Sequence, residues 1–150
     1  MSDSKNHHLL NIVQHQKSGV PRGVFSICSA NEFVIEAALE YGKKKNIPVL
    51  LESTSNQVNQ FGGYTGMRPV DFSRFVFSRA EKIGFSKNRV ILGGDHLGPS
   101  PWKKEKTDVA LAKASTLVEN YVLAGFTKIH LDASMYLGDD IGDRRERLDP

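Results

Sequence analysis

The chain has 150 residues, of which 39% are hydrophobic and 25% charged, with a net charge of +3 and a single cysteine. This composition is typical of one soluble globular domain, and the length is too short for two. One cysteine excludes a disulfide within the chain, and the scattered charges lack the basic stripe that nucleic-acid binding usually requires. No apolar run approaches the ~20 residues that span a bilayer. We therefore expect a cytoplasmic protein without a nucleic-acid or membrane partner.

Short apolar runs alternate with longer helical periods along the chain. A leading helix is predicted within residues 1–18, running from His8 to Lys17 and ending before Gly19. Four strands are then expected, at residues 23–28, 47–52, 89–94 and 127–131. Three helices separate them, reaching about Lys45, Ile83 and Ala124.

Start signals fix the beginnings of these three helices. Ser29 and Glu32 fit a capping box for the first, Pro69 fits the first turn of the second, and Thr107 can cap the third. On the first helix we expect an inner face, which is made by Phe33, Val34, Ala37, Ala38 and Tyr41.

The order β-α-β-α-β-α-β predicts an α/β fold with a parallel sheet, either a (β/α)8 TIM barrel or an open doubly wound sheet. Residues 138–150 form a polar tail that ends in Asp149-Pro150, a helix start signal. A barrel needs about 250 residues. We therefore interpret residues 1–150 as the N-terminal portion of a single barrel domain, with its first four β/α units and a missing next helix. The alternative is a complete open sheet with a polar tail.

Three of the predicted strands are followed by a carboxylate, namely Glu52, Asp95 and Asp132. The carboxyl ends of strands in a barrel converge on one rim, where active sites lie. Three independent turn residues would explain the same pattern. We favour a polar site and take Asp95, Glu52 and Asp132 as candidate catalytic residues.

Asp95-His96 is the most specific pair in the sequence, because imidazole binds zinc and a neighbouring carboxylate can act as acid or base. The alternative is a histidine hydrogen-bonded within a loop, since one histidine does not make a metal site. By strand alternation, His130 and Asp132 share a face. A core role and a functional role for His130 both remain open.

The loop at residues 53–68 is rich in amides and glycines, which suit either a sugar ligand or a structural loop. The candidate substrate-binding residues are Ser29, Asn56, Gln57 and Ser134. Cys28 is expected to be a small buried residue without a paired base. Trp102 fits a sugar-stacking ring or a subunit contact. The sequence contains neither GxxxxGK[ST] nor GxGxxG, so no nucleotide cofactor is predicted.

Several long motifs resemble one known family. They are SICSAN (26–31), IEAAL (35–39), LLESTSNQVNQFGGYTGMRP (50–69), FVFSRAEKIGF (75–85), VILGGDHLGP (90–99) and AGFTKIHLDASM (124–135). They look like those of the companion, non-catalytic subunit of class II D-tagatose-1,6-bisphosphate aldolase. The resemblance covers the chain from about Gly23 to Met135.

This resemblance implies a longer barrel protein that supports the activity and stability of a catalytic aldolase subunit. The pathway implied is the breakdown of galactitol or N-acetylgalactosamine through tagatose 6-phosphate, and a sugar phosphate is an expected ligand. A more remote similarity to catalytic class II aldolases implies Asp95 as acid/base and His96 as ligand of a divalent metal such as zinc. The alternative function is a metal-dependent ketose or ketose-phosphate C4-epimerase or aldolase, active by itself.

Overall fold

The computed structural model describes residues 7–141 of the chain. Its helices and strands follow in the order α1 (His8–Lys17), β1 (Ser26–Cys28), α2 (Glu32–Lys45), β2 (Val49–Thr54), α3 (Pro69–Ile83), β3 (Val90–Leu97), α4 (Thr107–Leu123) and β4 (Lys128–Leu131). The predicted alternation of strands and helices is confirmed over this range. The predicted helix start at Asp149-Pro150 lies outside the described residues.

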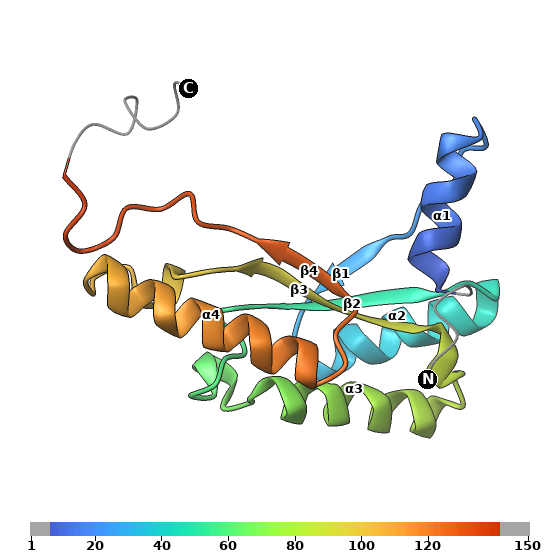
Figure 1. Cartoon of the computed structure of the whole chain (residues 1–150). Helices are drawn as coiled ribbons and strands as arrows, with labels where there is room; N and C mark the ends of the chain where they lie inside the picture. Colours follow the sequence, from blue (N-terminus) through green and yellow to red (C-terminus); the bar gives the residue numbers. More distant parts are fainter. Residues whose placement is uncertain (1–6, 142–150) are drawn as a thin grey trace.

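The strands form one parallel sheet in the order β1-β2-β3-β4 (Figure 1). Helices α2, α3 and α4 lie together on one face of this sheet, which we call the helix-covered face. The opposite face, called the open face, carries a row of aligned residues from the four strands, namely Cys28, Glu52, Gly93 and Lys128. The predicted α/β fold with a parallel sheet is therefore confirmed.

Helix α1 begins near the segments that lead into the later strands. Nε2 of His7 lies 3.0 Å from Oγ1 of Thr127, just before β4, and Nε2 of His8 lies 3.1 Å from the carbonyl oxygen of Asn88, just before β3. This places the start of α1 at the edge where the strands begin.

The predicted inner face of α2 was largely wrong. Its buried residues are Ile35, Ala38, Leu39 and Gly42, which follow the i, i+3, i+4, i+7 spacing of an amphipathic helix. Phe33, in contrast, is 78% exposed. The stripe that faces the sheet therefore starts at Ile35, two residues after Phe33, which places it on a different side of the helix. Gly42 leaves room for the side chain of Val49, which a Cβ atom would meet.

Two predicted caps were also wrong. Asn31, and not Ser29, caps α2: its Oδ1 accepts hydrogen bonds from the backbone of Phe33 at 3.0 Å and of Val34 at 3.3 Å. Ser29 instead accepts a bond from the backbone N–H of Asn31. A residue whose side chain reaches two free helical N–H groups satisfies more of the helix end than one placed farther upstream.

At α4, the cap comes from far along the chain. Both the N–H and the hydroxyl of Thr107 donate to Oδ1 of Asp139, at 2.7 and 2.6 Å. The start of the predicted polar tail thus contacts α4, with Gly138 also donating to the carbonyl of Glu105 at 2.8 Å. Within the described part of the chain, no helix is long and apolar enough to cross a membrane.

Candidate functional site

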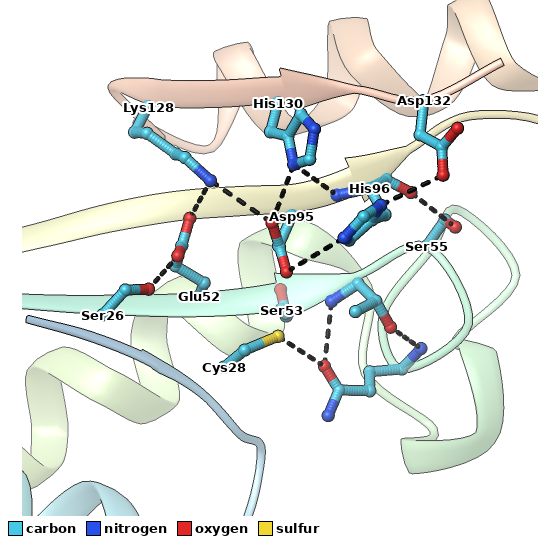
Figure 2. A network of polar contacts seen from close by, with 12 residues as sticks. Ser26, Cys28, Glu52, Ser53, Ser55, Asp95, His96, Lys128, His130 and Asp132 are labelled. Atoms are coloured by element: carbon cyan, nitrogen blue, oxygen red, sulfur yellow. Dashed lines mark hydrogen bonds and ion pairs between the residues drawn. The ribbon is translucent and has the colours of Figure 1, made fainter. Parts of the chain in front are cut away.

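An irregularity in β3 places two consecutive polar residues on the open face. Gly94 pairs with Ile129 and Leu97 with Leu131, so three steps on β3 match two on β4. The extra residue forms a bulge, and His96 adopts a left-handed backbone with φ +49°. Successive side chains of a regular strand point to opposite faces. Asp95 faces the polar residues of β4 by this alternation, and the bulge turns His96 to the same side (Figure 2).

The sequence analysis placed Asp95 and His96 at the end of the third strand and in the loop after it. In the structure, β3 continues to Leu97 and includes both residues. The loop expectation was therefore wrong for His96, whose carbonyl oxygen accepts a hydrogen bond from Ser55 at 3.2 Å. A left-handed histidine is uncommon, and such conformations cluster at functional sites.

Glu52 lies at the centre of the open face and is only 4% exposed. It accepts a hydrogen bond from the hydroxyl of Ser26 and forms an ion pair with the ammonium group of Lys128. Gly93, the neighbour of Glu52 in register, makes room for this carboxylate, because a Cβ atom there would lie 2.5 Å from Oε1. The buried negative charge is therefore held by a specific partner, as burial requires.

Asp95 joins this pair to two imidazole rings. Its Oδ1 lies 3.4 Å from Nζ of Lys128 and 2.9 Å from Nδ1 of His130, and its Oδ2 lies 3.9 Å from Nε2 of His96. Burial opposes the charged form of Asp95, but His130 and Lys128 outweigh it and lower the pKa of this carboxyl. Asp95 is thus an ionised acceptor at neutral pH.

Asp132 holds the second imidazole. Its Oδ2 lies 3.0 Å from Nδ1 of His96, and its Oδ1 accepts the backbone N–H of Ser134 at 2.9 Å. Hydrogen bonds from Ser134, followed by the one from His96, lower the pKa of Asp132 to about 2. Because Asp132 is ionised, Nδ1 of His96 carries the proton and donates it.

The three predicted catalytic carboxylates are therefore gathered in one network, and so is His96. Figure 2 shows Glu52 and Asp95 linked through Lys128, and Asp132 linked to Asp95 through His96. Sequence reasoning missed Lys128 altogether. Its signal was present, because Lys128, His130 and Asp132 alternate along β4 and its end.

The predicted substrate-binding residues lie around this network rather than within it. Ser134 contacts Asp132 through its backbone, and Gln57 accepts the N–H of Thr54 at 2.9 Å, beside the thiol of Cys28 at 3.8 Å. Asn56 is exposed, and its carbonyl accepts the N–H of Tyr64. Ser29 serves the turn before α2. A substrate role for these four residues stays a prediction.

Cys28 differs from expectation, and Trp102 is largely buried. Cys28 is exposed rather than buried. Partial desolvation and the nearby Asp95 raise the pKa of its thiol to about 11, which fits the expected lack of nucleophilic activation. Trp102 is only 9% exposed and packs edge-on against Phe61, with ring centroids 6.1 Å apart. Most of its surface is therefore used within the described fold.

The loop of residues 53–68 also folds on itself. The Asn59 side chain is buried, donates to the carbonyl of Ser55 at 2.9 Å, and accepts the N–H groups of Phe61 and Gly63. These bonds satisfy the amide within the loop. The structural interpretation of Asn59 therefore applies, and Gln57 and Gln60 also make contacts within the fold, whereas Asn56 is exposed.

The chain matches one protein family over most of its length. Residues 9–148 fit the family model described as D-tagatose-1,6-bisphosphate aldolase subunit GatZ/KbaZ-like. The chain is 56% identical over 129 residues to the D-tagatose-1,6-bisphosphate aldolase subunit GatZ of Escherichia coli O1:K1. The match covers 86% of this chain and 31% of that protein. The GatZ subunit of Escherichia coli O139:H28 is 55% identical over the same share.

A solved structure agrees with this match. It is the crystal structure described as a probable tagatose 6 phosphate kinase from Sinorhizobium meliloti 1021, with 54% sequence identity and a TM-score of 0.77. The similarity covers 79% of this chain and 31% of that one. The chain thus spans about a third of the length of the relatives it matches.

Proposed function

Because the chain belongs to the D-tagatose-1,6-bisphosphate aldolase subunit GatZ/KbaZ-like family, we propose that it is part of the component that supports the catalytic subunit of this aldolase. The observation that carries the proposal is the family match over residues 9–148. The partner is then the catalytic aldolase subunit, and the pathway is the breakdown of tagatose 6-phosphate from galactitol or N-acetylgalactosamine.

The sheet topology supports a (β/α)8 barrel as the parent fold. In an open doubly wound sheet, the strand order reverses at a switch point and helices cover both faces. Here the strands follow one another as β1-β2-β3-β4, and α2, α3 and α4 lie on one face (Figure 1). Sequential order with helices on one side fits the wall of a barrel, whose interior would be the open face.

The open face would then be the place where a ketose phosphate binds. Asp95, Glu52 and Asp132 supply carboxylates there, and His96 supplies a ligand for a divalent metal such as zinc. When bound, such a cation polarises a carbonyl oxygen and stabilises negative charge on it. Asp95 would hold or release a proton near that oxygen. Ser29, Asn56, Gln57 and Ser134 would contact sugar hydroxyls from the surrounding loops.

This polar network favours a second candidate function, a metal-dependent ketose or ketose-phosphate C4-epimerase or aldolase that acts without a partner. A supporting subunit needs buried apolar contacts more than a carboxylate and imidazole network. The second candidate ranks below the first because the matched curated relatives are described as subunits of the aldolase.

One pair of measurements separates the two candidates. The protein is assayed for cleavage of D-tagatose 1,6-bisphosphate and for ketose-phosphate epimerisation, alone and with a class II catalytic subunit. The supporting role predicts no turnover alone and a higher rate or longer lifetime of the catalytic subunit. Asp95→Asn should leave that support intact. Turnover by the isolated protein that Asp95→Asn abolishes would instead establish the second candidate.

A further inference from the structure

Two imidazoles, not one, face the same carboxylate on the open face. Among the described residues, one ligand atom each from Asp95, His96 and His130 lies within 4.8 Å of the others. The two rings are 4.5 Å apart between centroids and tilted by 56°. Because β3 and β4 are neighbouring strands, their pairing fixes this spacing. The donors are therefore brought together by the sheet rather than by mobile loops.

The hydrogen bonds prepare one nitrogen of His96 for a cation. Its Nδ1 donates to Asp132, which leaves Nε2 with a lone pair that points toward Asp95 Oδ2, 3.9 Å away. A carboxylate that holds the far nitrogen of a histidine is the usual device that orients a metal ligand and fixes its tautomer. Asp132 is itself held by the N–H of Ser134.

His130 presents its Nδ1 to the same space. Two contacts reach this nitrogen: Asp95 Oδ1 at 2.9 Å and the backbone N–H of His96 at 3.5 Å. The shorter contact is to a carboxylate, so Nδ1 carries a proton when no cation is bound. A cation would take the place of that proton, and the neutral ring would carry its proton on Nε2 instead. Binding then needs no net loss of a proton from His130.

The charge of the network matches a divalent cation. Glu52, Asp95 and Asp132 are three carboxylates, and among residues 7–141 Lys128 is the ammonium group in contact with them, which leaves two negative charges when both histidines are neutral. Two nitrogens and one oxygen suit zinc, cobalt or related ions, whereas magnesium and calcium prefer oxygen ligands alone. The His96 side chain is 57% exposed, so a further position is open to a ligand.

We propose that Asp95, His96 and His130 together bind one divalent transition-metal cation of the zinc class, with Asp132 as the residue that orients His96. The inference deepens the metal role proposed above for His96 and rests on that role. It changes the part given to two carboxylates: Asp95 becomes a metal ligand, and Asp132 a positioning residue. It also assigns a function to His130, which the sequence left open between core and site.

The test measures metal binding without any aldolase subunit. The metal-free protein is titrated with Zn²⁺ and Co²⁺ by calorimetry, and with Mg²⁺ for comparison. We expect one Zn²⁺ per chain and much weaker binding of Mg²⁺. His130→Ala and His96→Ala should each weaken binding at least as much as Asp132→Asn, for which about 10–100-fold is expected. His15→Ala is the matched control, because the His15 imidazole contacts the carbonyl of Asn11 within α1 and lies outside this network.

A spectroscopic measurement on the unsubstituted protein tests the same site even if some of the variants do not fold. In nitrogen-resolved NMR of the imidazoles, Zn²⁺ should shift Nε2 of His96 and Nδ1 of His130, while Nδ1 of His96 keeps its proton. A folded protein that binds neither Zn²⁺ nor Co²⁺ would overturn the site and leave the supporting role untouched. Binding that shifts His96 but not His130 would overturn the three-ligand assignment.

Discussion

The two faces of the sheet are built on different principles. On the helix-covered face, Val49, Leu51 and Leu92 pack against α2, α3 and α4 in one apolar cluster. On the open face, Glu52 and Lys128 occupy the neighbouring row of the same strands and are held by ionic contacts. The first face is specified by volume and apolar area, the second by charge and hydrogen-bond geometry. A substitution that destabilises the helix-covered face should therefore act by leaving a cavity, whereas one on the open face should act by leaving a charge without its partner.

The largest effect is expected on the helix-covered face. Leu51→Ala removes a fully buried side chain, and a cavity there should lower the free energy of unfolding by about 4 kcal/mol. Leu50→Ala is the matched variant, since Leu50 is the preceding residue but lies outside that cluster. We expect a smaller loss for Leu50→Ala, measured by urea unfolding. Equal losses would show that the two faces do not differ in packing.

A charge substitution should give the next largest effect. Lys128→Met leaves the carboxylate of Glu52, which is 4% exposed, without its ionic partner. Removing one partner of such a pair should lower the free energy of unfolding by about 3 kcal/mol. The loss should not be larger, because Lys128 is partly exposed to water. Adding Glu52→Gln should recover most of that loss, since no buried charge then remains.

The pair also bears on the proposed metal site. Lys128 lies 3.4 Å from Asp95 Oδ1, so its ammonium group opposes a cation bound to that carboxylate. The double variant should bind Zn²⁺ more tightly than the unsubstituted protein, as measured by the same titration. Weaker binding by a double variant of normal stability would mean that Lys128 supports the site rather than limits it.

The sequence predicted the parts of the fold that depend on local spacing. The bounds of α1 and α3 follow from Gly19, Pro69 and Gly84, residues that can end or begin a helix wherever they occur. The gathering of Glu52, Asp95 and Asp132 was predictable, because the ends of parallel strands meet at one edge. The spacing could not predict how buried each of these residues is, or which of them lie within a strand rather than after it.

The missed features depend on contacts between distant segments. The alternation of Lys128 with His130 and Asp132 indicated its face, but a lysine in a short strand normally indicates solvent. Its role comes from the pairing with Glu52, 76 positions earlier by residue number. The bulge at His96 leaves no signal, because histidine replaces the glycine that usually marks a left-handed residue. The cap of α4 by Asp139 likewise joins residues far apart in the chain.

The smallest predicted effect concerns that cap. Bonds from the side chain and then the backbone of Thr107 lower the pKa of Asp139 below its ordinary value of 3.8. A lowered folded-state pKa means that the stabilisation is present above the unfolded value and is lost as the pH falls through the folded value. Asp139→Ala should therefore reduce stability at neutral pH, by less than either substitution above, and the difference should vanish in acid.

Asp139→Asn keeps a capping oxygen without the charge, so its stability relative to Asp139→Ala should not change with pH. Hydrogen exchange at the start of α4, followed from neutral to acidic pH, measures both. A difference between the protein and Asp139→Ala that persists unchanged in acid would mean that the carboxylate does not act through its charge at this helix end.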